Sequence, residues 1–438
     1  MHTLEQLRAG KLAGSSRLDL ACGLTEFPTE IFDLADTLEI LNLSGNSLSA
    51  LPADLSRLHK LRILFCSDNQ FTELPTALGQ CQQLRMVGFK ANQIQTLPGA
   101  ALPPALRWLI LTDNQLRELP EEIGRCTQLQ KLLLAGNQLQ RLPETMQACT
   151  RLELLRLAAN RFTALPEWLL ALPRLTWLAY AGNPFCAATE ALAEAQHPIG
   201  TIEWQALRIG RQLGEGASGI ISQASWQPAE AAAAREVAVK VFKGAVTSDG
   251  LPHSEMVACI SAGAHPNLTT VEGKIGRHPA GAEGLVLALI DPAFGNLAGP
   301  PSFATCTRDV YAAGTSFGPA VVLRIVRGIA AAAAHLHQRG ILHGDLYAHN
   351  ILVTAAGDCL LSDFGAASFF DPEAPATAAA LQRLEVRAFG CLLEELLEHC
   401  ATAPAAFASL HELQQQCVQP VAAARPLFAD IEQVLLQL

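Results

Sequence analysis

Three oxygen-bearing side chains in the last third of the chain have the types and the spacing that phosphoryl transfer requires. Asp345 and Asn350 lie five residues apart before the apolar stretch 351–353, and Asp363 follows a second apolar stretch, 359–361. If the two stretches form a strand pair, all three side chains come from turns of one hairpin. One carboxylate can then orient an attacking hydroxyl, while the amide and the second carboxylate hold magnesium against the phosphates. We therefore predict that Asp345 is catalytic and that Asn350 and Asp363 bind Mg²⁺.

A glycine-rich turn and a lysine lie upstream of these residues. Gly214, Gly216 and Gly219 fall between two expected strands, and Lys240 follows Gly219 by 21 residues on a β-branched strand. A backbone without side chains can approach phosphate oxygens closely. The pair resembles the glycine loop and the strand lysine of protein kinases. That resemblance implies that these residues bind ATP and that the ammonium group of Lys240 neutralises charge on its α- and β-phosphates.

Together these motifs resemble the protein kinase family. The run 343–350 resembles its catalytic loop, 363–365 its Asp-Phe-Gly motif, and 237–241 the strand that carries its lysine. The likeness extends over residues 205–438. It implies a bilobal domain that transfers the γ-phosphate of ATP, with Mg²⁺, to a protein hydroxyl, and we expect serine or threonine as the acceptor.

The resemblance also implies roles for further residues. Glu255 is expected to hold Lys240 in an ion pair, with Asp249 as the fallback partner. The expected adenine contacts are Ile221 above the base, Ala238 and Leu352 on its two faces, and the backbone of Ala288 and Leu289 at the hinge. The packing column that aligns the two lobes is expected to consist of Cys259, His343 and Phe364.

Several positions depart from the kinase pattern. Gly344 stands where the family carries an arginine, and Glu385 stands where it carries an aspartate in the core helix. The segment 363–389 lacks an Ala-Pro-Glu sequence, and its hydroxyl groups belong to Ser368 and Thr377. Because the missing arginine normally binds a phosphate on the activation loop, activation by loop phosphorylation is not expected. The enzyme is expected to be competent without it.

The acceptor class is less well determined. Tyr347 replaces the lysine typical of serine/threonine kinases, and His349 lies near the position where some tyrosine kinases carry an arginine. The catalytic loop is also similar to that of aminoglycoside-type small-molecule phosphotransferases. A third alternative is an inactive pseudokinase that serves as a scaffold. The four residues predicted to be catalytic are all present, which favours an active protein kinase.

The first half of the chain is an internal repeat. Seven asparagines recur at intervals of 22 or 23 residues: Asn46, Asn69, Asn92, Asn114, Asn137, Asn160 and Asn183. The pattern resembles the leucine-rich repeat, in which short strands stack into a solenoid. The asparagines are predicted to bond to the backbone of neighbouring turns. Cys81, Cys126 and Cys149 each follow an asparagine by twelve residues, and we expect them to be core residues.

The repeat and the kinase motifs divide the chain into four segments. They are a helical cap (1–16), a leucine-rich repeat domain (17–196), a linker (197–204) and a protein kinase domain (205–438). The predicted fold class is multidomain α/β, with a leucine-rich-repeat solenoid followed by a bilobal protein-kinase-like α+β domain.

One face of the predicted solenoid is unusually apolar. Strand positions between the buried leucines carry the apolar residues Phe65, Trp108, Ile110, Leu133 and Trp177. Because exposed apolar patches usually mark contacts, we predict that this face binds a protein substrate or regulator. The alternative is that the kinase half packs against it.

Bulk composition limits the remaining possibilities. The 438 residues are 50% hydrophobic and 16% charged, with a net charge of −10, so no nucleic-acid partner is expected. Residues 1–5 do not resemble a signal peptide, and the apolar stretch 321–336 is interrupted by Arg324 and Arg327. Twelve cysteines without a C-x-x-C pair suggest reduced thiols. We therefore expect a cytoplasmic protein with no membrane span.

Overall fold

The computed structural model describes residues 2–216, 218–227, 233–244, 246–247, 249–401 and 407–438. Contacts divide the chain into two units, Met1–Leu175 and Thr176–Leu438, and each unit is described by itself. The boundary falls inside the predicted repeat region 17–196. The last repeat strand is therefore described with the second unit.

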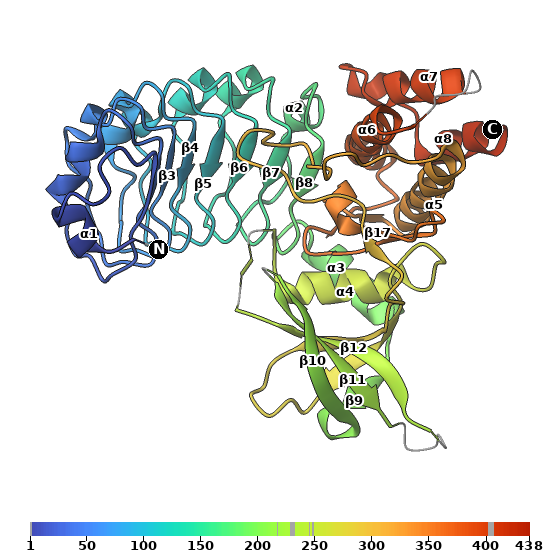
Figure 1. Cartoon of the computed structure of the whole chain (residues 1–438). Coiled ribbons are helices and arrows are strands. Elements are labelled where there is room, and N and C mark those ends of the chain that lie inside the picture. Colours follow the sequence, from blue (N-terminus) through green and yellow to red (C-terminus); the bar gives the residue numbers. More distant parts are fainter. Residues whose placement is uncertain (1, 217, 228–232, 245, 248, 402–406) are drawn as a thin grey trace. The chain divides into compact units, whose positions relative to one another are not determined.

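The first unit repeats a short strand followed by a 3₁₀ turn (η), drawn from dark blue to green in Figure 1. Its elements are, in order, α1 (Leu4–Arg8), β1 (Arg17–Asp19), η1 (Thr29–Leu34), β2 (Ile40–Asn42), η2 (Leu55–Arg57), β3 (Ile63–Phe65), η3 (Thr76–Gln80), β4 (Met86–Gly88), η4 (Gly99–Ala101), β5 (Trp108–Ile110), η5 (Glu121–Arg125), β6 (Lys131–Leu133), η6 (Glu144–Ala148), β7 (Leu154–Arg156) and α2 (Glu167–Leu170).

The strands of this unit pair in parallel, each with the next along the chain. The register places Leu18 opposite Leu41 and Leu41 opposite Leu64, and the same position is buried in every strand from β1 to β7. A proline in extended conformation precedes most of the turns, as Pro120 precedes η5. Each unit thus buries one apolar edge only by stacking on its neighbours, which is the reason for the repeat.

The regular spacing of the asparagines produces the predicted hydrogen-bond ladder. Asn137 accepts from the backbone N–H of Leu116 at 3.0 Å and donates to the carbonyls of Leu111 and Leu134 at 2.8 and 3.0 Å. Asn69, Asn92, Asn114 and Asn160 make equivalent bonds. Backbone groups that are buried between turns are satisfied in this way. The predicted ladder is confirmed.

The cysteines of the repeats are free thiols. Cys81, Cys126 and Cys149 are buried at the ends of the 3₁₀ turns η3, η5 and η6, and none is paired in a disulfide. Burial raises the pKa of Cys81 to about 11, so its thiol stays protonated near neutral pH. The prediction that these cysteines are core residues is confirmed.

The second unit begins with the last repeat strand and continues into a six-stranded sheet with order β10-β11-β12-β14-β13-β9. The elements of this part are β8 (Trp177–Ala179), α3 (Ala187–Gln196), β9 (Thr201–Glu203), η7 (Trp204–Ala206), β10 (Leu207–Glu215), β11 (Gly219–Trp226), β12 (Arg235–Phe242), α4 (Pro252–Ala262), β13 (Val271–Gly276) and β14 (Gly284–Ala288). Helices α3 and α4 pack against each other (Figure 1).

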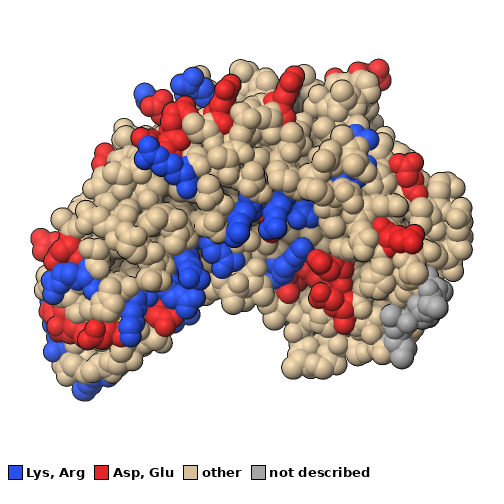
Figure 2. Space-filling model, turned by 90° about the horizontal axis from the view of Figure 1, so that it is seen from above, with Lys and Arg blue, Asp and Glu red and all other residues tan. Residues whose placement is uncertain are grey.

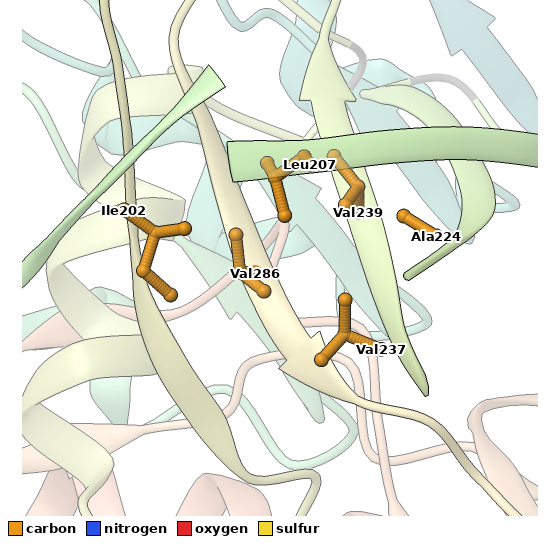
Figure 3. Packing of buried hydrophobic residues seen from close by; sticks show 6 residues of the cluster. All are labelled: Ile202, Leu207, Ala224, Val237, Val239 and Val286. Atoms are coloured by element: carbon orange, nitrogen blue, oxygen red, sulfur yellow. The ribbon is translucent and has the colours of Figure 1, made fainter. Parts of the chain in front are cut away.

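The stretch predicted as a linker, 197–204, contains a strand of this sheet. β9 pairs in parallel with β13, and Ile202 is buried with Leu207 and Val286 in the core of the sheet (Figure 3). Val237, Val239 and Ala224 complete the buried set. The apolar side chain of Ile202 explains why this short segment is drawn onto the sheet edge instead of crossing solvent.

The rest of the second unit is mainly helical. Its elements are β15 (Gly295–Asn296), α5 (Pro319–Gln338), β16 (Ile341–Leu342), η8 (Ala348–Asn350), β17 (Ile351–Val353), β18 (Cys359–Leu361), β19 (Ser368–Phe369), α6 (Pro375–Glu398), α7 (Ala408–Cys417), η10 (Ala422–Ala424) and α8 (Phe428–Leu436). β17 and β18 form the predicted hairpin, and β16 pairs with β19.

Helix α5 is long and apolar enough to cross a membrane by length and composition. This is weak support for a span, because the core helix of a folded domain meets the same criterion. Half of its apolar window is buried inside the fold, and Val322, Ile325 and Val326 are fully enclosed.

On the face drawn in Figure 2, charged side chains of both signs occur among large uncharged areas.

The asparagine ladder yields a stability prediction. Asn137→Ala leaves the backbone groups of three neighbouring residues without their buried partner, and we expect it to lower the free energy of unfolding by about 1–3 kcal/mol. Urea denaturation followed by circular dichroism measures the change. The control is Gln140→Ala, an exposed position in the same repeat. Equal midpoints for the two variants would show that the ladder does not stabilise the solenoid.

Candidate active site

The catalytic loop runs between β16 and β17 and brings two of the predicted residues into contact. The side-chain amide of Asn350 donates to the backbone carbonyl of Asp345 at 2.9 Å and to its carboxylate at 2.8 Å. Asn350 itself is buried at the end of η8, while the Asp345 side chain keeps partial exposure. The loop thus presents a carboxylate whose orientation is set by a buried neighbour, as a group that orients a substrate hydroxyl requires.

The buried carboxylate of Glu385 fixes the start of this loop. It accepts from the backbone N–H of Gly344 at 2.8 Å and of His343 at 3.2 Å, and it lies 2.7 Å from Nε2 of His337. Burial alone would raise the pKa of Glu385, but His337 and these backbone donors bring its pKa below the ordinary value. Glu385 therefore stands where the kinase aspartate was expected and is anchored to the loop.

Lys240 and Glu255 form the predicted ion pair. The two side chains are buried and in direct contact, one from β12 and the other from α4. Burial opposes the charge on Lys240, but the carboxylates of Glu255 and Asp363 raise its pKa. The ammonium group therefore stays charged at neutral pH. Glu255 is the partner of Lys240, which makes the fallback Asp249 unnecessary.

Asp363 lies close enough to both members of this pair to affect their pKa values. Its backbone adopts a left-handed conformation with φ of 59°, which Asp tolerates better than most residues. Its carboxylate accepts from the N–H of Gly365 at 3.1 Å, and a Cβ at Gly365 would lie 3.2 Å from that same carboxylate oxygen. The glycine thus lets the turn present Asp363 to the cleft.

The predicted packing column is present in part. The rings of His343 and Phe364 lie 5.2 Å apart, and both side chains are buried. Cys259 packs against a cluster in the other lobe that contains Phe242 and Met256. The contact between the two rings is confirmed, and the membership of Cys259 stays a prediction.

The glycine-rich turn joins β10 to β11. The N–H of Gly216 donates to the carbonyl of Gly219 at 2.9 Å, which closes the turn. A Cβ at Gly214 or Gly216 would meet no atom within 4 Å, whereas a Cβ at Gly219 would lie 2.5 Å from the carbonyl of Val241. Gly219 is therefore required for strand packing. The open space at Gly214 and Gly216 leaves their backbone accessible to a ligand.

The other predicted adenine contacts come from strands around the cleft. Ile221 lies opposite Lys240 in the β11–β12 pair, Ala238 lies on β12, and Leu352 lies on β17 opposite Asn296. Their roles as adenine contacts stay predictions.

One hinge prediction needs a correction. The backbone N–H of Ala288 donates to the carbonyl of Thr270 at 2.9 Å, because Ala288 is still part of β14. That N–H is therefore not available to adenine. Leu289 is the first residue beyond the strand, and the predicted adenine contacts of its backbone groups and of the Ala288 carbonyl stay predictions.

One polar pair that involves the catalytic loop was not predicted from the sequence. The Nδ1 atom of His349 lies 2.8 Å from a carboxylate oxygen of Asp309, and the backbone N–H of His349 donates to the other at 2.9 Å. Burial opposes the charge on this imidazole, but Asp309, Asp345 and Asp363 raise the pKa of His349. These carboxylates thus favour the protonated form of His349. Forty residues separate the partners, so local spacing could not reveal them.

The donor set at the base of the cleft fits Mg²⁺. Asn350 uses its amide nitrogen for the bonds to Asp345, which leaves the amide oxygen as a cation ligand, and Asp363 adds a carboxylate. Within the described residues, no group of three or more His, Cys, Asp or Glu side chains is placed to hold a metal. Two protein ligands are sufficient for Mg²⁺, which takes its other oxygens from phosphates and water.

The predicted partner-binding residues differ in exposure. Phe65, Trp108 and Ile110 are partly exposed, and Leu133 is largely buried. Trp177 is 2% exposed and its ring stacks on Tyr347 of the catalytic loop, at 4.1 Å between centroids. The prediction that Trp177 binds an outside partner is therefore wrong, because this strand packs on the kinase loop.

Comparison with known proteins agrees with this geometry. Residues 207–387 match the family described as protein tyrosine and serine/threonine kinase, and residues 37–58 match the leucine-rich repeat. A protein of Arabidopsis thaliana named as a probable serine/threonine-protein kinase is 25% identical over 177 residues, covering 36% of this chain and 29% of the relative.

Two further relatives also carry kinase names. The serine/threonine-protein kinase PrkC of Bacillus subtilis is 31% identical over 97 residues, 18% of this chain and 15% of the relative. A protein of Caenorhabditis elegans that carries a tyrosine-protein kinase name is 46% identical over 50 residues, 11% of this chain and 15% of the relative. The chain spans less than a third of the length of each of these relatives.

The second unit therefore contains a protein kinase domain, and the first unit contains a leucine-rich repeat. The fold class and the family predicted from the sequence are confirmed.

The Glu385 anchor yields a pH-dependent prediction. Glu385→Gln replaces one acceptor oxygen by a donor that faces a backbone N–H, and we expect it to lower the free energy of unfolding at pH 7 by about 1–3 kcal/mol. Because the pKa of Glu385 is lowered, its stabilisation is present above the ordinary carboxyl range and is lost as the pH falls through the folded-state pKa.

The difference between wild type and Glu385→Gln should therefore shrink as the pH is lowered below about 4. Denaturant titrations at pH 7, 5 and 3.5 measure it. The control is Glu398→Gln, an exposed glutamate on the same helix. A difference that stays constant over this range would mean that the charge of Glu385 is not what anchors the loop.

Proposed function

We propose that this protein is an ATP-dependent protein kinase that phosphorylates serine or threonine in a protein substrate. The observation that carries the proposal is the proximity of three groups: the Lys240–Glu255 ion pair, Asp363, which acts on the pKa of Lys240, and the Asp345–Asn350 pair, since Asp345 and Asp363 both act on the pKa of His349. A kinase fold that had lost its activity would not need to keep all five side chains. Their retention argues against the pseudokinase scaffold that we name as the alternative function.

The proposed mechanism assigns one task to each group. Asp345 orients the acceptor hydroxyl, whose oxygen attacks the γ-phosphorus as the bond to the bridging oxygen breaks and ADP leaves. The hydroxyl proton passes to the Asp345 carboxylate. Lys240 holds the α- and β-phosphates, and Asn350 with Asp363 would hold Mg²⁺, which neutralises charge on the phosphates.

The choice of a protein hydroxyl rests on the kinase family match and on the two serine/threonine names among the relatives. Tyr347, in place of the usual lysine, and His349, near the position of an arginine in some tyrosine kinases, leave tyrosine as a competing acceptor. An aminoglycoside-type small-molecule acceptor is less well supported, because the matched family acts on protein.

We propose that the repeats recruit the protein substrate or a regulator in the cytoplasm. The candidate surface is the partly exposed apolar group on neighbouring strands of the first unit: Phe65, Trp108, Ile110 and, to a smaller extent, Leu133. Phe65 lies across Gly88, where a Cβ would come within 2.6 Å of its ring. A bound substrate would reach the kinase domain at high effective concentration.

The first test is the intact mass of the purified protein after incubation with ATP and Mg²⁺. Wild type is expected to gain increments of about 80 Da, one for each phosphate added. Asp345→Asn and Lys240→Met should gain none, because the first cannot orient the hydroxyl and the second cannot hold the phosphates. Fragment spectra then identify the acceptor as serine, threonine or tyrosine.

The control for the folding of the variants is their thermal unfolding midpoint. If wild type gained no phosphate with added protein or small-molecule acceptors while still binding ATP, the pseudokinase scaffold would replace the proposed enzyme. Increments on a small-molecule acceptor alone would favour the phosphotransferase.

The repeat surface is tested separately from catalysis. Trp108→Asp places a charge among apolar side chains, and we expect it to reduce phosphorylation of protein substrates in a cell extract by about tenfold or more. Autophosphorylation should stay unchanged, since Trp108 lies outside the kinase domain. Gln115→Asp adds the same charge at an exposed position of the same repeat and serves as the control. Equal substrate labelling by both variants would remove this surface from the proposal.

A further inference from the structure

The segment that ends the repeats makes direct contact with the catalytic loop. The indole N–H of Trp177 donates to the backbone carbonyl of Leu346 at 3.1 Å, and its ring stacks on Tyr347 with an angle of 9° between the planes. Tyr347 is also within 5.0 Å of the ring of His349. Leu346 and Tyr347 directly follow Asp345, so Trp177 holds the backbone that carries the catalytic carboxylate.

The same strand occupies the place of the missing arginine. Gly344 has φ of 73°, and a Cβ added there would lie 2.9 Å from the carbonyl of Leu178 and 2.5 Å from that of Ala366. No side chain fits between these two backbones, and the conformation itself favours glycine. The departure of the sequence from the kinase pattern at Gly344 is therefore explained by the packing of β8 against the loop.

A second contact of this strand fixes the segment after the Asp-Phe-Gly motif. The backbone N–H of Tyr180 donates to the hydroxyl of Ser368 at 3.0 Å, and the Tyr180 hydroxyl donates to the carbonyl of Phe369 at 3.1 Å. Tyr180 and Ser368 are both buried. Ser368, one of the two hydroxyl residues noted in the segment 363–389, thus accepts an internal hydrogen bond. Because its side chain is buried, another kinase cannot reach its hydroxyl in this state.

A third contact reaches helix α4, which carries Glu255. One carboxylate oxygen of Glu190 in α3 accepts from the N–H of Gly182 at 2.8 Å, and the other accepts from the hydroxyl of Ser254 at 3.3 Å. Ser254 precedes Glu255 on α4 and is buried. The residues that follow β8 therefore also brace the helix that must bring Glu255 to Lys240.

We propose that residues 177–190 are a built-in positioning device for the kinase site, which holds the catalytic loop, the activation segment and helix α4 in place of a phosphorylated activation loop. The inference rests on the proposed kinase function and concerns how its site is kept competent. Trp177 and Tyr180 act through the backbone they hold and are positioning residues. A ring stack and neutral buried hydrogen bonds do here what an arginine–phosphate pair does in phosphorylated kinases.

The test uses the full chain and three variants. Trp177→Ala removes both the stack and the indole donor, Trp177→Phe keeps an aromatic ring without the N–H, and Tyr180→Phe removes the bond to Phe369. We expect kcat to fall by about tenfold or more in Trp177→Ala and to recover in part in Trp177→Phe, because small misplacements of catalytic groups are costly. The KM for ATP should change by less than about threefold, since Lys240 is not touched. Trp168→Ala, in α2 of the first unit, is the control.

A second readout does not depend on activity. Hydrogen exchange followed by mass spectrometry is expected to show faster exchange in peptides covering 343–350 and 366–370 in Trp177→Ala and Tyr180→Phe, and unchanged exchange in β12 and β14. Unaltered kcat and unaltered exchange in these folded variants would overturn the inference. If wild type transferred no phosphate, the proposed function would fail while exchange still decided whether residues 177–190 hold the loops. Should Trp177→Ala not fold, the milder variants Trp177→Phe and Tyr180→Phe decide in the same way.

Discussion

The kinase site depends on the buried carboxylate of Glu385. An isolated ionised carboxylate in a protein interior is strongly destabilising, and it is tolerated only when several donors surround it. Two backbone N–H groups at the start of the catalytic loop and the imidazole of His337 supply those donors. The charge therefore dictates where the loop must lie relative to α5 and α6. These contacts restrict the positions of Asp345 and Asn350, because both residues follow the anchored Gly344 within a few residues.

The other half of the site is arranged by a second buried charge pair. Lys240 and Glu255 come from different elements of one lobe and satisfy each other where water is excluded. Asp363, from the other lobe, acts electrostatically on both members of this pair. The site thus brings together three charged groups from three different elements. The site therefore needs contributions from β12, from α4 and from the turn that follows β18.

Local spacing in the sequence was sufficient for the parts of the structure that local chemistry determines. The asparagine ladder follows from a 23-residue period, and Lys240, Asp345, Asn350 and Asp363 follow from motifs whose members lie on adjacent turns. Glu255 could be chosen because it lies ten residues before His265-Pro266-Asn267, a run that resembles the turn after the corresponding helix in kinases.

The remaining features could not be read from spacing because they join distant segments. Trp177 was predicted on an exposed face, as the strand pattern implies for an isolated solenoid, but its partners Leu346 and Tyr347 lie about 170 residues later. Asp309 likewise meets His349 across forty residues. The engagement of the Ala288 N–H has a different cause: Ala288 is the last residue of β14, and its N–H donates to the carbonyl of Thr270.

The contacts of β8 bear on how a kinase domain can be held competent without a charged loop. An arginine–phosphate pair is long-range and reversible, but salt screens it when it is exposed, and it requires another enzyme to install the phosphate. The bonds of Trp177 and Tyr180 are short, buried and present whenever β8 is packed. Because the strand carbonyl at Leu178 fills the space beside Gly344, an arginine at that position would have to displace β8. An arginine at position 344 and the packing of β8 against the loop therefore exclude each other. With glycine at position 344, the chain adopts the packed arrangement.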